Sequence, residues 1–152
     1  MADTFDDLSN WLTPLMLRLA PAERAKLARE VAQGLRRSQQ QRVIAQRNPD
    51  GTPYEPRKER QLRGKQGRIK RKAKMFTKLR TARYLKATGN AGAATVAFAG
   101  RISRIARVHQ FGLRDRAERG APDVQYAQRE LLGFTDAERD YILDRTLAHL
   151  TL

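Results

Sequence analysis

The chain has 152 residues, of which 31 are Lys or Arg and 16 are Asp or Glu, so its formal net charge is +15. It contains no cysteine, which excludes a disulfide framework and a thiolate metal site. No apolar run approaches the roughly 20 residues that a membrane-spanning helix needs, and the acidic N-terminus lacks the basic region of a signal peptide. We therefore expect a soluble protein that is used without secretion and has no membrane partner.

The positive charge is concentrated in one block of the sequence. Between Arg36 and Arg83 there are seventeen Lys or Arg residues and three acids, so this block carries +14 of the total +15. The other segments carry little charge: residues 1–35 sum to −1, residues 84–112 to +4 and residues 113–152 to −2. This asymmetry indicates that the block meets a polyanion, an acidic protein surface, or both.

Two helices are predicted in the first part of the chain, and the second of them extends into the basic block. Apolar residues at helical spacing predict a helix over residues 4–19, which Pro14 should break or kink. We expect its apolar face in the core, with docking on a neighbouring subunit as the alternative. A second helix should begin at Pro21 and extend to about Ala45, because proline suits the first helical position. It must end before Asn48–Gly51, which has strong turn chemistry.

Residues 48–68 predict a long loop or extended arm, because they hold three Pro and three Gly with almost no apolar residues. Such a segment is expected to become ordered only on a partner. The basic run favours phosphate contacts, but only Tyr54 and Phe76 flank it, so stacking on bases has little support. We predict that residues 48–74 are an interaction arm acting through Arg57, Lys58, Arg63, Lys65, Arg68, Lys70, Arg71, Lys72 and Lys74.

The second half of the chain alternates strand and helix signals. A β-hairpin is predicted across residues 88–92, with its first strand near residues 79–87 and its second over residues 93–99. A short helix should follow from Ile102 and end at Gly112 as a C-cap.

A charged loop over residues 113–123 is expected next, then a third strand over residues 124–132. Thr135 and Glu138 form a capping-box pattern that starts a last helix, reaching about Leu150. That helix carries Leu143, Leu147 and Leu150 on one face. The whole pattern predicts one small α+β domain over residues 1–152, with helices packed on a small, mainly antiparallel sheet.

The sequence gives little support for a catalytic site or for a cofactor-binding site. The two histidines, His109 and His149, have no neighbouring ligand residues, so each is expected to be a structural histidine. A metal-dependent nuclease would need several acids converging on Mg²⁺, and nothing in the sequence fixes that geometry. Its candidate acids are spread over a predicted loop and strand: Asp115, Glu118, Asp123 and Glu130. We expect no enzyme activity, no cofactor and no metal.

Several segments together resemble the phage virion morphogenesis family, the tail completion proteins of contractile-tailed phages. The most specific are Asn48-Pro49-Asp50-Gly51-Thr52-Pro53-Tyr54 and Arg107-Val108-His109-Gln110-Phe111-Gly112, with Leu131-Leu132-Gly133-Phe134 in support. The order and spacing hold over nearly the whole chain. One departure is Ala127-Gln128-Arg129-Glu130, which lacks the proline usual in the family's turn at this place.

The resemblance implies a structural protein of the virion, made in the host bacterial cytoplasm and placed at the head-proximal end of the tail. It implies a homo-oligomeric ring, a hexamer by family resemblance, that contacts tail tube or terminator proteins and the head connector. Non-specific contact with genomic DNA in the channel is a further expectation. The family-motif residues are read as framework: Asn48, Asp50, Gly51, Tyr54, His109, Gln110, Gly112 and Gly133. The alternative is a protein that binds DNA or RNA non-specifically through the basic arm.

Overall fold

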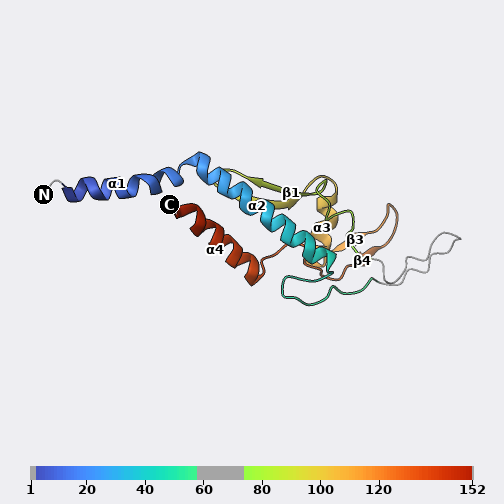
Figure 1. The fold of residues 1–152 in the computed structure, drawn as a ribbon. Helices are drawn as coiled ribbons and strands as arrows, with labels where there is room; N and C mark the ends of the chain where they lie inside the picture. Colours follow the sequence, from blue (N-terminus) through green and yellow to red (C-terminus); the bar gives the residue numbers. More distant parts are fainter. Residues whose placement is uncertain (1–2, 58–73, 152) are drawn as a thin grey trace. The chain divides into compact units, whose positions relative to one another are not determined.

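The computed structural model describes residues 3–57 and 74–151. In chain order its elements are α1 (Asp3–Arg18), α2 (Pro21–Ile44), β1 (Leu85–Gly89), β2 (Ala94–Phe98), α3 (Ile102–Phe111), β3 (Arg114–Arg116), β4 (Asp123–Gln125) and α4 (Asp136–Leu150) (Figure 1). The strands form two small antiparallel sheets, β1–β2 and β3–β4. The predicted α+β class is therefore confirmed.

The chain divides into two compact units. Unit 1 consists of residues Met1–Ser38, Lys86–Ala97 and Phe134–Leu152, and unit 2 of residues Gln39–Leu85 and Phe98–Gly133. Helix α2 contributes its first part to unit 1 and its last turns to unit 2. The arm residues 58–73 lie outside the described part of the chain, so their predicted conformation stays a prediction.

Unit 1 is held together by contacts that α2 makes with α4 and with the β1–β2 hairpin. Arg145 forms an ion pair with Glu30, 3.0 Å between Nη1 and Oε1, and the Tyr141 hydroxyl donates to the Glu30 carbonyl. At Gly89 the hairpin meets α2 backbone to backbone: a Cβ there would lie 2.3 Å from the Arg29 nitrogen. Only glycine permits so close an approach.

Helix α1 continues through Pro14, so the prediction that this proline breaks the helix was wrong. Proline removes one backbone donor, and the carbonyl that loses its partner belongs to Asn10, which is exposed and can bind water instead. The apolar face of α1 was also expected in the core. Instead the Trp11 side chain is 66% exposed, and Leu8, Met16, Leu17 and Leu19 are exposed as well.

The core of unit 2 joins the end of α2, the segment after the arm, α3 and the residues before α4. Its buried members are Val43, Tyr54, Met75, Phe76, Leu79, Ala106 and Leu131, with Phe98 and Ile102 packed against them. Edge-to-face contacts continue through this core, with ring centroids 5.7 Å apart for Tyr54 and Phe76 and 4.8 Å for Phe76 and His109. Such pairs add to the free energy gained by burial alone.

Three local predictions are confirmed. Helix α2 begins at Pro21 and ends at Ile44, close to the expected bounds. Gly112 caps α3 with a left-handed φ of 62°. Thr135 caps α4 with both hydrogen bonds of the capping box, since its hydroxyl accepts from the Glu138 nitrogen and the Glu138 carboxylate accepts from the Thr135 nitrogen.

The predicted strands were only partly right. The first hairpin strand is β1, Leu85–Gly89, rather than residues 79–87, because residues 75–84 form turns that bury Phe76 and Leu79. The predicted third strand shrinks to the three residues of β4, which pair with β3 inside the segment that was expected to be a loop. Beyond Gln125 the nitrogens of Tyr126 and Arg129 bond to the carbonyls of Leu113 and His109, and those of residues 130–132 bond to side chains.

Candidate interaction surface

A buried arginine holds the chain where the basic arm begins. The Arg129 side chain, 5% exposed, donates from Nε to the Glu55 carbonyl at 2.7 Å and from Nη2 to the Pro56 carbonyl at 3.0 Å. Its own backbone nitrogen donates to the His109 carbonyl at 2.7 Å. These bonds fix the backbone directly before Arg57, the first of the basic residues predicted to act in the arm, whose side chain is exposed. The arm was predicted to begin at residue 48, which was wrong for residues 48–56, because Tyr54 is buried in the core and hydrogen bonds hold Asn48, Glu55 and Pro56 in unit 2.

A glutamine holds the chain where the arm returns. The Gln46 carboxamide accepts from the Met75 nitrogen at 2.7 Å and donates to the Met75 carbonyl at 3.0 Å. Gln46 itself has a left-handed φ of 57°, an unusual conformation for a residue with a side chain. Lys74, the last predicted arm residue, is exposed next to this anchor. Both ends of the arm therefore leave unit 2 from fixed points.

The Asn48–Gly51 turn docks on the segment before α4. Asp50 Oδ1 accepts from the Thr52 hydroxyl at 2.6 Å and from the Thr52 nitrogen at 2.9 Å, which closes the turn locally and lowers the pKa of the Asp50 carboxyl. Asn48 Oδ1 accepts from the Glu130 nitrogen at 2.9 Å, and the Tyr54 hydroxyl donates to the Glu130 carbonyl at 3.2 Å.

The end of α3 docks on the same segment. Gln110 Oε1 accepts from the nitrogens of both Leu131 and Leu132 at 2.9 Å, and its amide donates to the Leu132 carbonyl at 2.8 Å. Gly133 completes the fit, because a Cβ there would lie 2.6 Å from Cγ of Pro49. The predicted framework residues are thus brought together in unit 2, around one extended segment, residues 126–133.

His109 lies at the centre of this framework in its neutral form. Arginine can only donate, so the 3.3 Å contact between Arg129 Nη1 and His109 Nδ1 requires Nδ1 to be the acceptor and Nε2 to carry the proton. Burial, with Arg129 and Arg57 nearby, lowers the pKa of His109 to about 4. Burial also raises the pKa of Tyr54 to about 12. These groups keep their protonation states at neutral pH, as a structural role requires.

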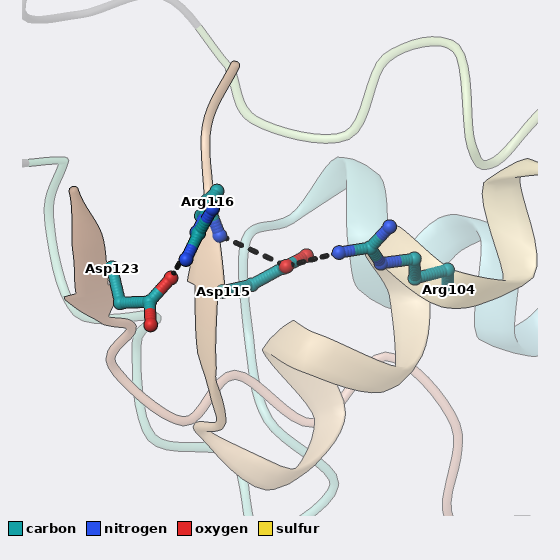
Figure 2. Close-up of polar contacts among 4 residues, drawn as sticks. All are labelled: Arg104, Asp115, Arg116 and Asp123. Carbon is teal, nitrogen blue, oxygen red and sulfur yellow. Dashed lines mark hydrogen bonds and ion pairs between the residues drawn. The ribbon is translucent and has the colours of Figure 1, made fainter. Parts of the chain in front are cut away.

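Helix α3 and the β3–β4 hairpin carry a second set of charged residues outside the arm. Figure 2 shows Arg104 of α3 ion-paired with Asp115 of β3, and Arg116 of β3 with Asp123 of β4, the latter at 2.7 Å. An open hollow of about 430 Å³ lies beside these pairs, lined by Arg101, Ser103, Arg104, Ile105, Asp115 and Arg116. The sequence analysis named Asp115 and Asp123 among the acids that a nuclease would need and found nothing that fixes such a site; in the structure both acids pair with arginines.

The two units differ sharply in charge. The sequence ranges of unit 1 contain nine basic and nine acidic residues, whereas those of unit 2 contain 22 basic and seven acidic residues. All of the net charge of +15 therefore belongs to unit 2, which carries both the arm and the α3 arginines. Charge of one sign on this scale attracts polyanions or acidic protein surfaces.

Unit 1 instead exposes apolar side chains. Besides those of α1, it exposes Phe134 and two leucines of α4, Leu143 at 56% and Leu147 at 53%. Exposed apolar residues gathered on neighbouring helices are typical of protein–protein contacts. The sequence pattern identified these residues as one face of each helix, but it did not show that the faces are uncovered.

Two classes of site are not found in the described part of the chain. Within residues 3–57 and 74–151, no group of three or more His, Asp or Glu side chains is arranged to hold a metal ion. None of the described helices is both long and apolar enough to cross a membrane.

Among the predicted arm residues, Arg57 and Lys74 are described and exposed. The others lie outside the described residues: Lys58, Arg63, Lys65, Arg68, Lys70, Arg71 and Lys72. Sequence reasoning missed Arg129 and Gln46, the two anchors. The only sequence signal for Arg129 was the missing proline in its segment, which pointed to an unusual local structure.

Comparisons with known proteins show the family of the chain. The phage virion morphogenesis family matches residues 3–151 of the chain. Tail completion protein S of Escherichia phage P2 is 44% identical over 147 residues, which are 96% of this chain and 97% of that protein. No solved structure is significantly similar. This chain therefore belongs to the phage virion morphogenesis family.

Proposed function

We propose that the protein completes the tail at its head-proximal end and joins it to the head connector as a homo-oligomeric ring. Its role there is structural and involves no catalysis. The basic arm is the segment that engages the neighbouring assembly. The observation that carries this proposal is the anchoring of the arm: Arg129 and Gln46 fix its two ends on a rigid framework in the unit that holds all the net charge.

The arrangement suits stepwise assembly. A basic segment with few apolar residues, held at both ends, can become ordered on a partner surface, and it does so only once that surface exists. The partner must be acidic, because residues 57–74 hold ten basic residues and a single acid, Glu59. An acidic surface of a tail tube or connector protein meets this requirement, and so does DNA in a channel.

The test is a triple charge reversal within the arm, Lys70→Glu, Arg71→Glu and Lys72→Glu, in a phage that depends on this gene. We expect a folded protein and a lysate in which full heads and tails remain separate. A matched control reverses Arg24, Lys26 and Lys78, three exposed residues outside the arm. Normal infectious particles from the arm variant would refute the proposed use of the arm.

The second candidate function is non-specific binding of DNA or RNA by the arm. It is favoured by the concentration of charge in unit 2. The salt dependence of binding distinguishes nucleic-acid binding from the assembly function. A protein whose main role is to bind nucleic acid loses affinity for duplex DNA along a steep log–log salt slope. An assembly protein instead associates with purified tails at salt concentrations where binding to DNA is already lost.

A further inference from the structure

We propose that the exposed face of α4 in one copy of the chain docks on the exposed face of α3 in a second copy. This inference rests on the proposed function and adds to it the two surfaces through which the subunits of the ring bind one another. Only the place where the ring acts depends on the proposed function, because self-association of the chain can be measured without a phage.

The α4 face is both acidic and apolar. Asp140, Leu143, Asp144 and Leu147 follow one another at positions i, i+3, i+4 and i+7, so they lie on one side of the helix, and all four are exposed. The opposite side of α4 is the one that packs within unit 1, through Tyr141 and Arg145. Asp140 and Asp144 have no ion-pair partner among the described residues.

The α3 face has the complementary character. Arg104, Arg107 and Phe111 follow at positions i, i+3 and i+7, and all three are exposed, Phe111 at 61%. The ion pair with Asp115 fixes the Arg104 side chain but leaves it 75% exposed. Within the described part of the chain, Arg107 has no acidic partner.

The two faces match in length and in order. Each spans eight residues, and its first and last residues are seven positions apart, a rise of about 10 Å along a helix. With the helices side by side in the same direction, Arg104 and Arg107 lie opposite Asp140 and Asp144. The apolar ends, Phe111 and Leu147, then meet. The free charges are neutralised while the apolar side chains leave water, the combination found in specific protein interfaces.

Two properties of the α3 face favour a second copy of this chain over nucleic acid. An exposed phenylalanine beside arginines gains nothing from phosphates, whereas Arg and Phe are both enriched in protein interfaces. An acidic residue, Asp115, also pairs directly with Arg104 of this face. Because the contact joins two different surfaces, each copy can bind one neighbour on either side, and such contacts close into a ring or continue as a filament.

The experiment uses two charge-swapped variants of the full chain. One carries Asp140→Arg and Asp144→Arg, the other Arg104→Glu and Arg107→Glu. Mass measured by light scattering over a concentration series should show self-association of the wild type, weakened by about tenfold or more in each variant alone. An equimolar mixture should associate again, because each mixed contact pairs opposite charges. This rescue also shows that both variants are folded.

The control reverses Arg24 and Lys26, exposed residues of α2 that give the same change in charge as the α3 variant, and it should associate like the wild type. A wild type that stays monomeric throughout the series would overturn the inference, and so would a mixture that fails to associate. It would also be overturned if the α3 variant lost duplex DNA binding while its self-association stayed unchanged. Failure of the proposed function is distinguishable, since it appears as normal head–tail joining in a phage without the gene.

Discussion

The guanidinium of Arg129 and the imidazole of His109 form a buried polar pair, 3.3 Å between Nη1 and Nδ1, beside the first residues of the basic arm. Arg129 binds the backbone before the arm, and His109 accepts the arginine's remaining contact while its ring packs on Phe76 and Tyr126. The pair therefore links the core of unit 2 to the arm. The predictions below follow from this link and from the other anchors.

Replacing Arg129 with alanine should destabilise the protein by about 3 kcal/mol, because the carbonyls of Glu55 and Pro56 lose buried donors. Urea unfolding followed by circular dichroism measures the change. The matched control is Arg119→Ala, an exposed arginine for which we expect less than about 0.5 kcal/mol. Equal stability of Arg129→Ala and the control would show that the contacts at the arm are dispensable.

The stability of the protein should fall as the pH is lowered from about 6.5 to about 4. The pKa of His109 is about 4 in the folded state and 6.5 in an unperturbed histidine, so the unfolded chain binds the proton more strongly in this window. Lower pH therefore favours unfolding. The pKa values of Asp50 and Asp115 are lowered, so the stability that these carboxylates contribute is lost only below this window.

The measurement is the midpoint of urea unfolding at several pH values, for the wild type and for His109→Gln. Glutamine keeps an acceptor for Arg129 but does not titrate, so the variant should show a flatter profile between pH 4 and 6.5. A variant profile as steep as that of the wild type would mean that another group governs this window.

Gln46 combines backbone strain with three side-chain hydrogen bonds, two with Met75 and one from its amide to the Val43 carbonyl. Two substitutions separate these contributions. Gln46→Ala keeps the strained φ and loses all three bonds, and should cost about 2–3 kcal/mol. Gln46→Gly loses the same bonds but relieves the strain, so it should cost about 1 kcal/mol less than the alanine variant. Thermal unfolding of the two proteins gives the comparison, and a glycine variant less stable than the alanine variant would contradict the account.

Gly89→Ala should destabilise unit 1 by more than about 2 kcal/mol, because the new Cβ would meet the backbone of Ala28 and Arg29, which cannot move aside as a side chain can. Gly92→Ala, in the same hairpin, meets only the Asn90 side chain at 3.5 Å and should be nearly neutral. Chemical denaturation of both variants tests the pair. Similar losses in the two would show that the hairpin does not pack closely on α2.

The features that the sequence predicted correctly depend on neighbouring residues. Pro21 at the start of α2, Gly112 after α3 and the Thr135 capping box each act within one turn of helix, so their residue types are sufficient signals. The turn at Asn48–Gly51 is of the same kind. These motifs also carried the resemblance to the family, and the comparisons confirmed it.

The features that were missed depend on contacts between distant residues. A strand was predicted over residues 124–132, but the nitrogens of residues 130–132 bond to the side chains of Asn48 and Gln110, which lie 82 and 21 to 22 residues away in the sequence. The role of Arg129 could not be predicted for the same reason. An arginine normally lies at the surface, and here the distant carbonyls of Glu55 and Pro56 keep it buried. The exposure of α1 could not be foreseen either, because an apolar face does not reveal what covers it.

Electron microscopy of a lysate from a phage that lacks this gene tests the central claim most directly. The account predicts full heads beside separate tails, with joined particles restored when the wild-type protein is supplied from a plasmid. Normal joined particles in the absence of the protein, with a defect in DNA content or replication, would contradict it and favour the nucleic-acid-binding function.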